Sequence, residues 1–516
     1  MDDKLKPAGF RYPFGEESCE HEVAILQEKY RDYFYDQSRF NRETLERDTY
    51  LIVGRRGAGK TSLAKYLTFQ PYIKNTNCID VDEPDVYNDA LQDVANSSHY
   101  YSLDITTRKI EKIWEYLIWA LIFNEYQDYS SDIKTASLLL SPKVEMARLA
   151  SKFLKQLLSH WIGDNGDLAN KMEMYISSSS FQEAKEQVLE ITARNPVIVA
   201  VDTIERYDPY NDALMATVTG LIQCANQFNI LYAPRGIHIK VFMSAEIYPH
   251  LVETVIPNPT KQVRHPIFLY WRPKDLIRLV SWRFYRYLRN TPSISKVPSQ
   301  PINWDKFQDV LEGMWYPYFG KEIVNRRGIL EKSFPYILRH TQMRPRQMVI
   351  LCNAIAKEAL KVNVFPEFYR LPIRNVVRDV ELNLAIEVLN SYSKIYPGVS
   401  KIVDALRSFP VIFDGSLLDK VAPTTAAAWG RGKYSPTNFR QLIAELGIVG
   451  RVRSYDERSG IVSADFEYNL TDRLGLTSND KCAIHPMYYR KLQIKHDPKV
   501  IVYPFPDHPD FDEIIT

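Results

Sequence analysis

Eight consecutive residues carry the clearest chemistry in this sequence. They read Gly54-Arg55-Arg56-Gly57-Ala58-Gly59-Lys60-Thr61 and fit the pattern G-x-x-x-x-G-K-[ST] at each fixed position. Glycines let a loop wrap closely around a phosphate group, so that backbone N–H groups at the start of the next helix point at it. In this pattern the lysine reaches the β- and γ-phosphates of a nucleotide, and the hydroxyl after it binds Mg²⁺.

The pattern therefore predicts a nucleotide site with Lys60 as a catalytic residue and Thr61 as a magnesium ligand. Arg55 or Arg56 could contact phosphate or the adenine edge, although the pattern requires neither. The predicted nucleotide-binding residues are Gly54, Arg55, Arg56, Gly57, Ala58, Gly59, Lys60, Thr61 and Ser62.

Such a loop needs an acidic partner at the end of a neighbouring buried strand. Residues 197–201 read VIVAV, a continuous apolar run typical of a buried parallel strand, and Asp202 follows it. We predict that Asp202 holds Mg²⁺ through water; the alternative is an aspartate that caps the next helix. Thr203 occupies the commonest position of a catalytic acid. Glu205 is then the nearest candidate to orient an attacking water, or it is a surface residue.

Three further residues are sensor candidates. Ser244 follows the predicted strand at 237–243, where a polar side chain could detect the γ-phosphate, unless it is a plain serine at a strand end. Arg344 and Arg346 precede and begin a predicted helix. Their guanidinium groups could reach the γ-phosphate or form surface ion pairs.

The elements around these residues predict an α/β core. A short apolar strand at 50–53 runs into the glycine-rich loop and a helix, and the runs 197–201 and 237–243 predict further buried strands. Helical periodicity dominates from about 82 to 190, in the segments 110–123, 143–161 and 181–193. A parallel sheet with a helical insertion accounts for this order.

The predicted division of the chain has five parts. We expect an N-terminal helical segment at 1–45, an α/β core at 46–265, a helical lid at 266–375, a winged-helix-like domain at 376–495 and a flexible tail at 496–516. In the fourth part, helices near 376–395, 400–408, 415–420 and 435–446 precede two strands that flank a turn at 456–460. The last part is rich in proline and acidic residues.

The winged-helix-like part has two interpretations. As a DNA reader, its last helix would enter the major groove, and Arg451, Arg453 and Arg458 near the turn would meet phosphates. That helix contains Arg440 as its one basic residue, alongside Glu445, which favours a packing or protein-interaction module.

Composition excludes several classes of protein. The chain has 516 residues with a net charge of +2, too little to coat nucleic acid by bulk electrostatics. Five scattered cysteines form no metal-binding pattern, and no apolar run approaches the ~20 residues of a membrane helix. We expect a cytoplasmic protein that binds no membrane.

The segments GRRGAGKTSL, VIVAVDTIERY, VFMSAEIY, RPKDLIRLVSWRF, RPRQMVILCNAIAKEAL and AIHPMYYRKL resemble bacterial P-loop ATPases of the AAA-like and STAND/KAP group. The resemblance covers residues 10–495, and the loop is its specific part. It implies an ATPase core, a helical lid and a C-terminal winged helix, and in several groups a switch in defence against phage. Members of the KAP type have two adjacent acids where this chain has Asp202 and Thr203, while Glu205 and Arg206 match the following acid and arginine.

These observations lead to one expected function and two alternatives. We expect a slow Mg²⁺-dependent ATPase that acts as a switch with a protein partner or by self-association. ATP is favoured over GTP because the sequence contains no N-K-x-D motif, which would indicate guanine binding. The alternatives are a DNA-binding ATPase of the initiator or loader kind and a scaffold that binds nucleotide without turnover.

Overall fold

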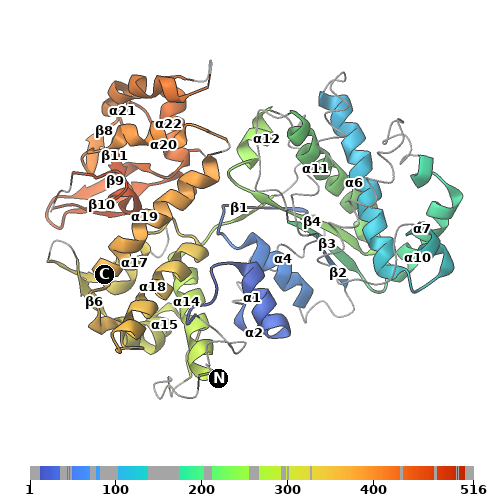
Figure 1. Ribbon diagram of the computed structural model, residues 1–516, viewed down its shortest axis with the longest axis horizontal. Helices are drawn as coiled ribbons and strands as arrows, with labels where there is room; N and C mark the ends of the chain where they lie inside the picture. The colour runs from blue at the N-terminus through green and yellow to red at the C-terminus, as the bar shows by residue number, and fades with distance from the viewer. Residues whose placement is uncertain are drawn as a thin grey trace. The chain divides into compact units, whose positions relative to one another are not determined.

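A computed structural model (Figure 1) places two compact units along the chain. Unit 1 comprises Met1–Tyr35 and Tyr270–Thr516, and unit 2 comprises Asp36–Leu269. The residues that the structure describes are 12–34, 44, 46, 49–69, 77–81, 103–137, 174–202, 212–254, 266–291, 298, 301–325, 328–393, 395–430, 434–469, 473–495, 497 and 499–505.

Unit 2 contains a parallel sheet of five strands in the order β2-β3-β4-β1-β5. This confirms the predicted mixed α/β class. The two further buried strands that the sequence predicts are β3 and β4, and both begin at the predicted residues. Strand β3 is a continuous apolar run, whereas β4 includes His238 and Lys240 among its apolar residues. Strand β4 pairs with β1, so Asp202 ends the second strand from the loop strand and not its immediate neighbour. The strands are β1 (Leu51–Gly54), β2 (Asn77–Val81), β3 (Val197–Asp202), β4 (Ile237–Ser244) and β5 (Ile267–Leu269).

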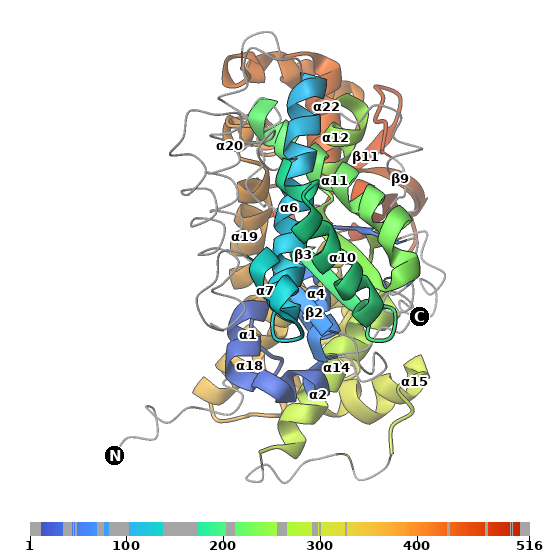
Figure 2. The same ribbon diagram turned by 90° about the vertical axis from the view of Figure 1, so that its right-hand side faces the viewer.

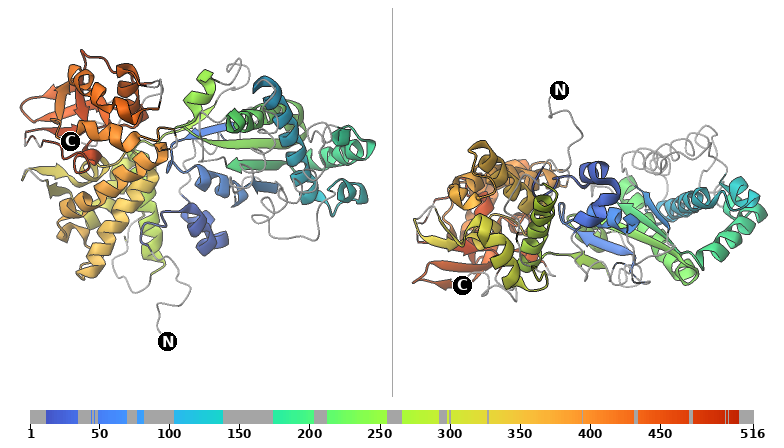
Figure 3. Two further views of the ribbon diagram at one scale, coloured as in Figure 1. Left: turned by 45° about the horizontal axis from the view of Figure 1, so that its top comes forward. Right: turned by 90° about the horizontal axis from the view of Figure 1, so that it is seen from below.

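Helices cover both faces of this sheet (Figure 3). Helix α4 (Lys60–Phe69) lies on one side, and α6 (Leu103–Tyr126) and α11 (Asp212–Tyr232) lie together on the other. The two long helices approach closely at Gly220, where a Cβ atom would lie 2.9 Å from Ile110. Beyond them are α7 (Ser131–Ala136) and α10 (Ser179–Thr192), while α12 (Tyr248–Thr254) follows β4. The insertion is thus helical where it is described, and the predicted helix at 143–161 falls outside those residues.

The N-terminal segment belongs to unit 1, where α1 (Cys19–Leu26) and α2 (Tyr30–Tyr33) lie beside α14 (Pro273–Arg289) (Figure 2). The residues before α1 contact α18 (Pro345–Lys361). Phe14 stacks on Phe284 of α14, and its N–H donates to Asn353 Oδ1 of α18 at 3.1 Å. Polar and aromatic contacts therefore join the start of the chain to helices more than 250 positions later.

The helices of unit 1 continue through α17 (Ser333–Leu338) and α19 (Ile373–Tyr392). The sequence predicts no strands here, but β6 (Glu322–Val324) and β7 (Leu330–Lys332) form an antiparallel hairpin. Each strand is too short to show an alternation of apolar and polar residues in the sequence. Shorter helical turns of unit 1 are α15 (Phe307–Val310), Leu311–Trp315, α16 (Tyr316–Phe319), Gln27–Lys29, Phe368–Arg370, Asp404–Leu406, Ala422–Ala428, Glu467–Asn469 and Pro486–Tyr488. Ala233–Arg235 is the corresponding turn in unit 2.

The C-terminal part of unit 1 is a second sheet in the order β12-β10-β9-β11-β8. The predicted helices correspond to α19, α20 (Val399–Val403), α21 (Ser416–Val421) and α22 (Pro436–Glu445), and the predicted strand pair corresponds to β9 (Val449–Asp456) and β10 (Ile461–Asp465). Strands β8 (Ile412–Asp414) and β11 (Lys481–Ile484) were not predicted.

The segment expected to be a flexible tail contributes to this sheet. Strand β12 (Ile501–Tyr503) pairs in parallel with β10, and Val502 and Phe505 are buried. The apolar run at 500–503 is short enough to be hidden by the prolines and acids around it, and its burial fixes residues 499–505 in the fold.

Candidate functional site

The glycine-rich loop joins β1 to α4 at the carboxyl edge of the parallel sheet. Gly57 has φ +80° and Gly59 has φ +97°, a region that side chains with a Cβ atom rarely adopt. Gly54 lies so close to the following helix that a Cβ atom there would be 3.1 Å from Lys60 Cγ. These three positions explain why the loop requires glycine.

The Lys60 side chain folds back over this loop. Its ammonium group donates to Gly54 O at 2.9 Å and to Arg55 O at 3.4 Å, and the residue is 7% exposed. Within the described part of the chain, these acceptors are carbonyl groups and not carboxylates. The positive charge is therefore held at the loop by neutral partners.

The first turn of α4 brings the loop to the end of β3. Thr61 Oγ1 donates to Asp202 Oδ2 at 2.6 Å, which places the two predicted magnesium ligands in direct contact. Hydrogen bonding within the helix begins when Leu63 N–H donates to Gly59 O at 2.9 Å. The preceding N–H groups of an α-helix have no partner inside the helix, and this makes its N-terminus suited to an anion.

The end of β4 lies against the start of the loop. Gly54 is paired with Ser244 in the parallel register, and Ala245 N–H donates to Gly54 O at 3.0 Å. The predicted sensor Ser244 is therefore a neighbour of the loop, at the same edge as Asp202. Glu205 and Thr203, together with Arg206, lie outside the described residues.

Sequence reasoning missed one residue of this site. Glu246 is 3% exposed, and its carboxylate accepts hydrogen bonds from Arg56 N–H at 3.0 Å and from the Ser244 hydroxyl. In the sequence, Glu246 is recognisable only as an acidic residue two positions after the serine that ends a predicted strand. Its partner in the loop is 190 positions earlier, so the sequence does not reveal the contact.

The remaining sensor candidates, Arg344 and Arg346, are bonded inside unit 1. Arg344 is buried and donates to Gln342 Oε1 at 2.8 Å. Arg346 donates to Glu17 O at 2.9 Å and pairs with Glu387 at 3.3 Å. Both guanidinium groups thus have acceptors within their own unit.

Arginines of the C-terminal part are paired with acids in the same way. Arg451 lies 3.0 Å from Asp480, Arg453 lies 2.5 Å from Asp465, and Arg440 of α22 pairs with Asp419. The DNA interpretation assigns Arg451 and Arg453 to phosphate contacts and places Arg440 on the helix that would enter the major groove, so all three side chains already have acidic partners.

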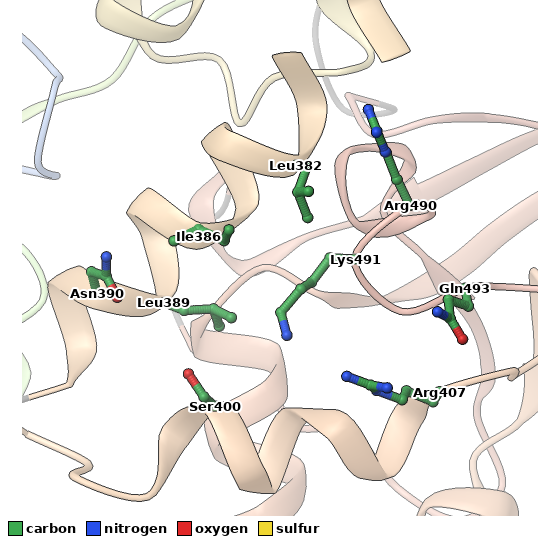
Figure 4. Close-up of a pocket in the computed structure, with 9 residues that line it drawn as sticks. All are labelled: Leu382, Ile386, Leu389, Asn390, Ser400, Arg407, Arg490, Lys491 and Gln493. Carbon is green, nitrogen blue, oxygen red and sulfur yellow. The ribbon is translucent and has the colours of Figure 1, made fainter. Parts of the chain in front are cut away.

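Unit 1 also has a pocket of about 590 Å³. Figure 4 shows the Lys491 ammonium group between Leu389 of α19 and Arg407. Asp404 lies 3.2 Å from Lys491 and 3.3 Å from Arg407, so a carboxylate already partners both cations. The pocket therefore differs from the loop, where Lys60 faces carbonyl groups.

The residues at the loop fit a magnesium nucleotide. Mg²⁺ is usually bound by one or two protein oxygens together with substrate phosphates and waters, and Thr61 and Asp202 supply two such oxygens. Within the described ranges, no group of three or more His, Cys, Asp or Glu side chains is placed to hold a metal by itself. This donor set suits an ion delivered with a phosphate ligand.

None of the helices in the described ranges combines the length and the apolar character that crossing a membrane requires. Comparison of the chain with protein-family models, curated proteins and solved structures found no match.

Proposed function

We propose that unit 2 binds ATP with Mg²⁺ at the Gly54–Thr61 loop and hydrolyses it slowly, so that the protein acts as a nucleotide-operated switch. The observation that carries the proposal is the convergence of Lys60, Thr61 and Asp202 at one edge of a parallel sheet. A P-loop core requires a cation, a magnesium-binding hydroxyl and a strand-end acid in this arrangement.

Each residue has a defined role in this proposal. The loop N–H groups and Lys60 bind the β- and γ-phosphates, and Thr61 and Asp202 hold Mg²⁺, directly or through water. The ion supplies neutralisation of charge on the phosphates. Ser244 contacts the γ-phosphate, and Glu205 orients the attacking water.

The switch part of the proposal rests on unit 1. Arg344 or Arg346 would reach the γ-phosphate after leaving its present acceptors. Arg344 is linked through Gln342 to the C-terminal part, because Gln342 Oε1 accepts from Arg344 while Gln342 Nε2 donates to Leu446 O at 2.7 Å. A change at Arg344 would therefore act on the residue that follows α22. This contiguous contact is a physical route for coupling.

The C-terminal part fits a winged-helix-like module that contacts protein better than one that reads DNA. Its order of helices followed by a strand pair supports the winged-helix-like architecture. The ion pairs of Arg440, Arg451 and Arg453 support contact with protein rather than with DNA. A role in defence against phage is an extension of the proposal that rests on the family resemblance.

The proposal is tested by ATP binding and turnover in the full-length protein. Lys60→Ala should abolish both, whereas Lys65→Ala, the same change five residues later on α4, should retain them. Equal binding by wild type and Lys60→Ala would refute the proposed site. Double-stranded DNA is added in a parallel series, and turnover that rises with DNA and falls in Arg451→Ala would favour the DNA-linked alternative.

A further inference from the structure

The buried carboxylate of Glu246 is unexpected beside a loop that is suited to anions. Its two oxygens accept from the Arg56 N–H in the loop and from the Ser244 hydroxyl at the end of β4. At 3% exposure the residue is largely removed from water, and charge interactions are stronger at such a buried position than they are in water. The carboxylate of Glu246 therefore connects the loop to Ser244, the proposed γ-phosphate sensor.

We infer that Glu246 is a positioning residue that competes with the γ-phosphate for the hydroxyl proton of Ser244. It thereby lowers the affinity of the site for ATP relative to its affinity for ADP. This inference rests on the proposed function. A serine hydroxyl has a single proton and donates to one strong acceptor at a time. While Ser244 donates to Glu246, it cannot donate to a phosphate oxygen.

The competition acts on the triphosphate alone. A γ-phosphate must draw the Ser244 hydroxyl away from Glu246 and must also approach the negative charge of that carboxylate. ADP ends at the β-phosphate and leaves the Ser244–Glu246 bond intact. Glu246 therefore lowers the affinity for ATP relative to ADP, while its bond to Arg56 N–H holds the loop in place.

Glu246→Gln separates these two effects. The amide oxygen can still accept from Arg56 N–H, while the amide nitrogen donates to the Ser244 oxygen and leaves the hydroxyl proton available to the γ-phosphate. We expect the ratio of ATP affinity to ADP affinity to rise about tenfold, the size of one hydrogen bond to a charged group. Glu186→Gln, the same change on the exposed face of α10, is the control and should leave the ratio unchanged.

Ser244→Ala provides a second test, and its single variant does not depend on the folding of Glu246→Gln. In the wild-type background the hydroxyl gains one partner and loses another when ATP binds, so its removal should change the affinity ratio less than about threefold. In the Glu246→Gln background the same removal should cancel most of the tenfold rise, because the hydroxyl is then committed to the γ-phosphate.

The measurement is calorimetric titration with ATP and with ADP, both in Mg²⁺, of five proteins: the wild type, Glu246→Gln, Ser244→Ala, the double variant and the Glu186→Gln control. A ratio unchanged by Glu246→Gln, with both nucleotides weakened alike, would assign Glu246 a purely structural role and overturn the inference. A tenfold loss of ATP preference in Ser244→Ala alone would overturn it as well. Lys60-dependent binding with an unchanged ratio defeats the inference alone, whereas absence of Lys60-dependent binding defeats it together with the proposed function.

Discussion

Thr61 and Asp202 are separated by 141 positions in the chain and are joined by a hydrogen bond of 2.6 Å. The first residue is in the opening turn of α4 and the second ends β3, so the bond fixes the helix that follows the loop to the edge of the sheet. Two oxygens of the kind that Mg²⁺ prefers are thereby held side by side.

Removal of the hydroxyl should raise the magnesium requirement. We expect Thr61→Ala to increase the Mg²⁺ concentration for half-maximal ATP binding by about tenfold, because one oxygen ligand is lost. Thr61→Ser keeps the oxygen and should behave as wild type. A magnesium titration of ATP binding measures the effect, and identical curves for Thr61→Ala and wild type would show that Thr61 is not a ligand.

The backbone of the loop should penalise any side chain at Gly59. With φ +97°, an alanine there is strained, and we expect Gly59→Ala to lower the free energy of unfolding of unit 2 by about 1–2 kcal/mol. Gly475→Ala is the comparison, because a Cβ atom at that position meets nothing within 4 Å. Urea unfolding of each variant gives the two values, and equal losses would remove the conformational explanation.

A buried ion pair connects the N-terminal segment to α14. Glu22 and Arg283 lie 2.8 Å apart, with side chains 4% and 10% exposed. Glu22→Leu leaves a buried guanidinium without its carboxylate and should cost about 3–5 kcal/mol of unfolding free energy. The double replacement Glu22→Leu with Arg283→Leu should recover most of this loss.

The matched control is an exposed pair on α18. Lys361 and Glu358 lie 3.4 Å apart with side chains 73% and 37% exposed, so Glu358→Leu should cost less than about 1 kcal/mol. Chemical denaturation of both single variants gives the contrast. Similar losses at the two sites would mean that burial does not set the strength of the Glu22–Arg283 pair.

The stability of unit 1 should depend on pH through His485. Burial, and secondarily the charge of His340, lower the pKa of His485 well below its ordinary value of 6.5. Its Nδ1 accepts from Met487 N–H at 3.1 Å, so protonation at this nitrogen would break that bond. The unfolded chain therefore binds a proton near pH 6.5 that the folded chain does not.

It follows that the contribution of neutral His485 to the free energy of unfolding is complete above about pH 6.5 and is lost as the pH falls below that value. The expected slope is about 1.4 kcal/mol per pH unit in that range. His485→Gln should reduce the acid sensitivity by this amount in thermal unfolding from pH 7 to 5. Tyr468→Phe, which keeps the imidazole, should retain it; an unchanged slope in His485→Gln would refute the assignment.

Some elements could be predicted because their signals are local. The runs that form β3 and β4 are rich in β-branched residues and long enough to be recognised, and helix α14 is evident from its amphipathic spacing. The loop could be recognised because the two fixed glycines of its pattern are positions where the conformation requires glycine: Gly54 approaches Lys60 closely, and Gly59 has φ +97°. The resulting contact of Thr61 with Asp202 followed from the rule that parallel strands end at one edge.

Other features depend on distant parts of the chain. Strands of three residues, such as β8 and β12, are too short for periodicity and exist because neighbouring strands pair with them. Glu246 acquires its role from Arg56, and Glu22 from Arg283. Such acids resemble surface residues in the sequence, and only the fold distinguishes them.

The division of unit 1 between the two ends of the chain has a consequence for its synthesis. Glu22 leaves the ribosome 261 residues before Arg283, its partner. At ordinary bacterial or eukaryotic elongation rates this interval is roughly 13–50 s, during which the whole of unit 2 emerges. Phe14 therefore emerges long before Phe284, on which it stacks. The α/β unit can fold during this interval, and the N-terminal segment can pack against α14 only after unit 2 has been synthesised.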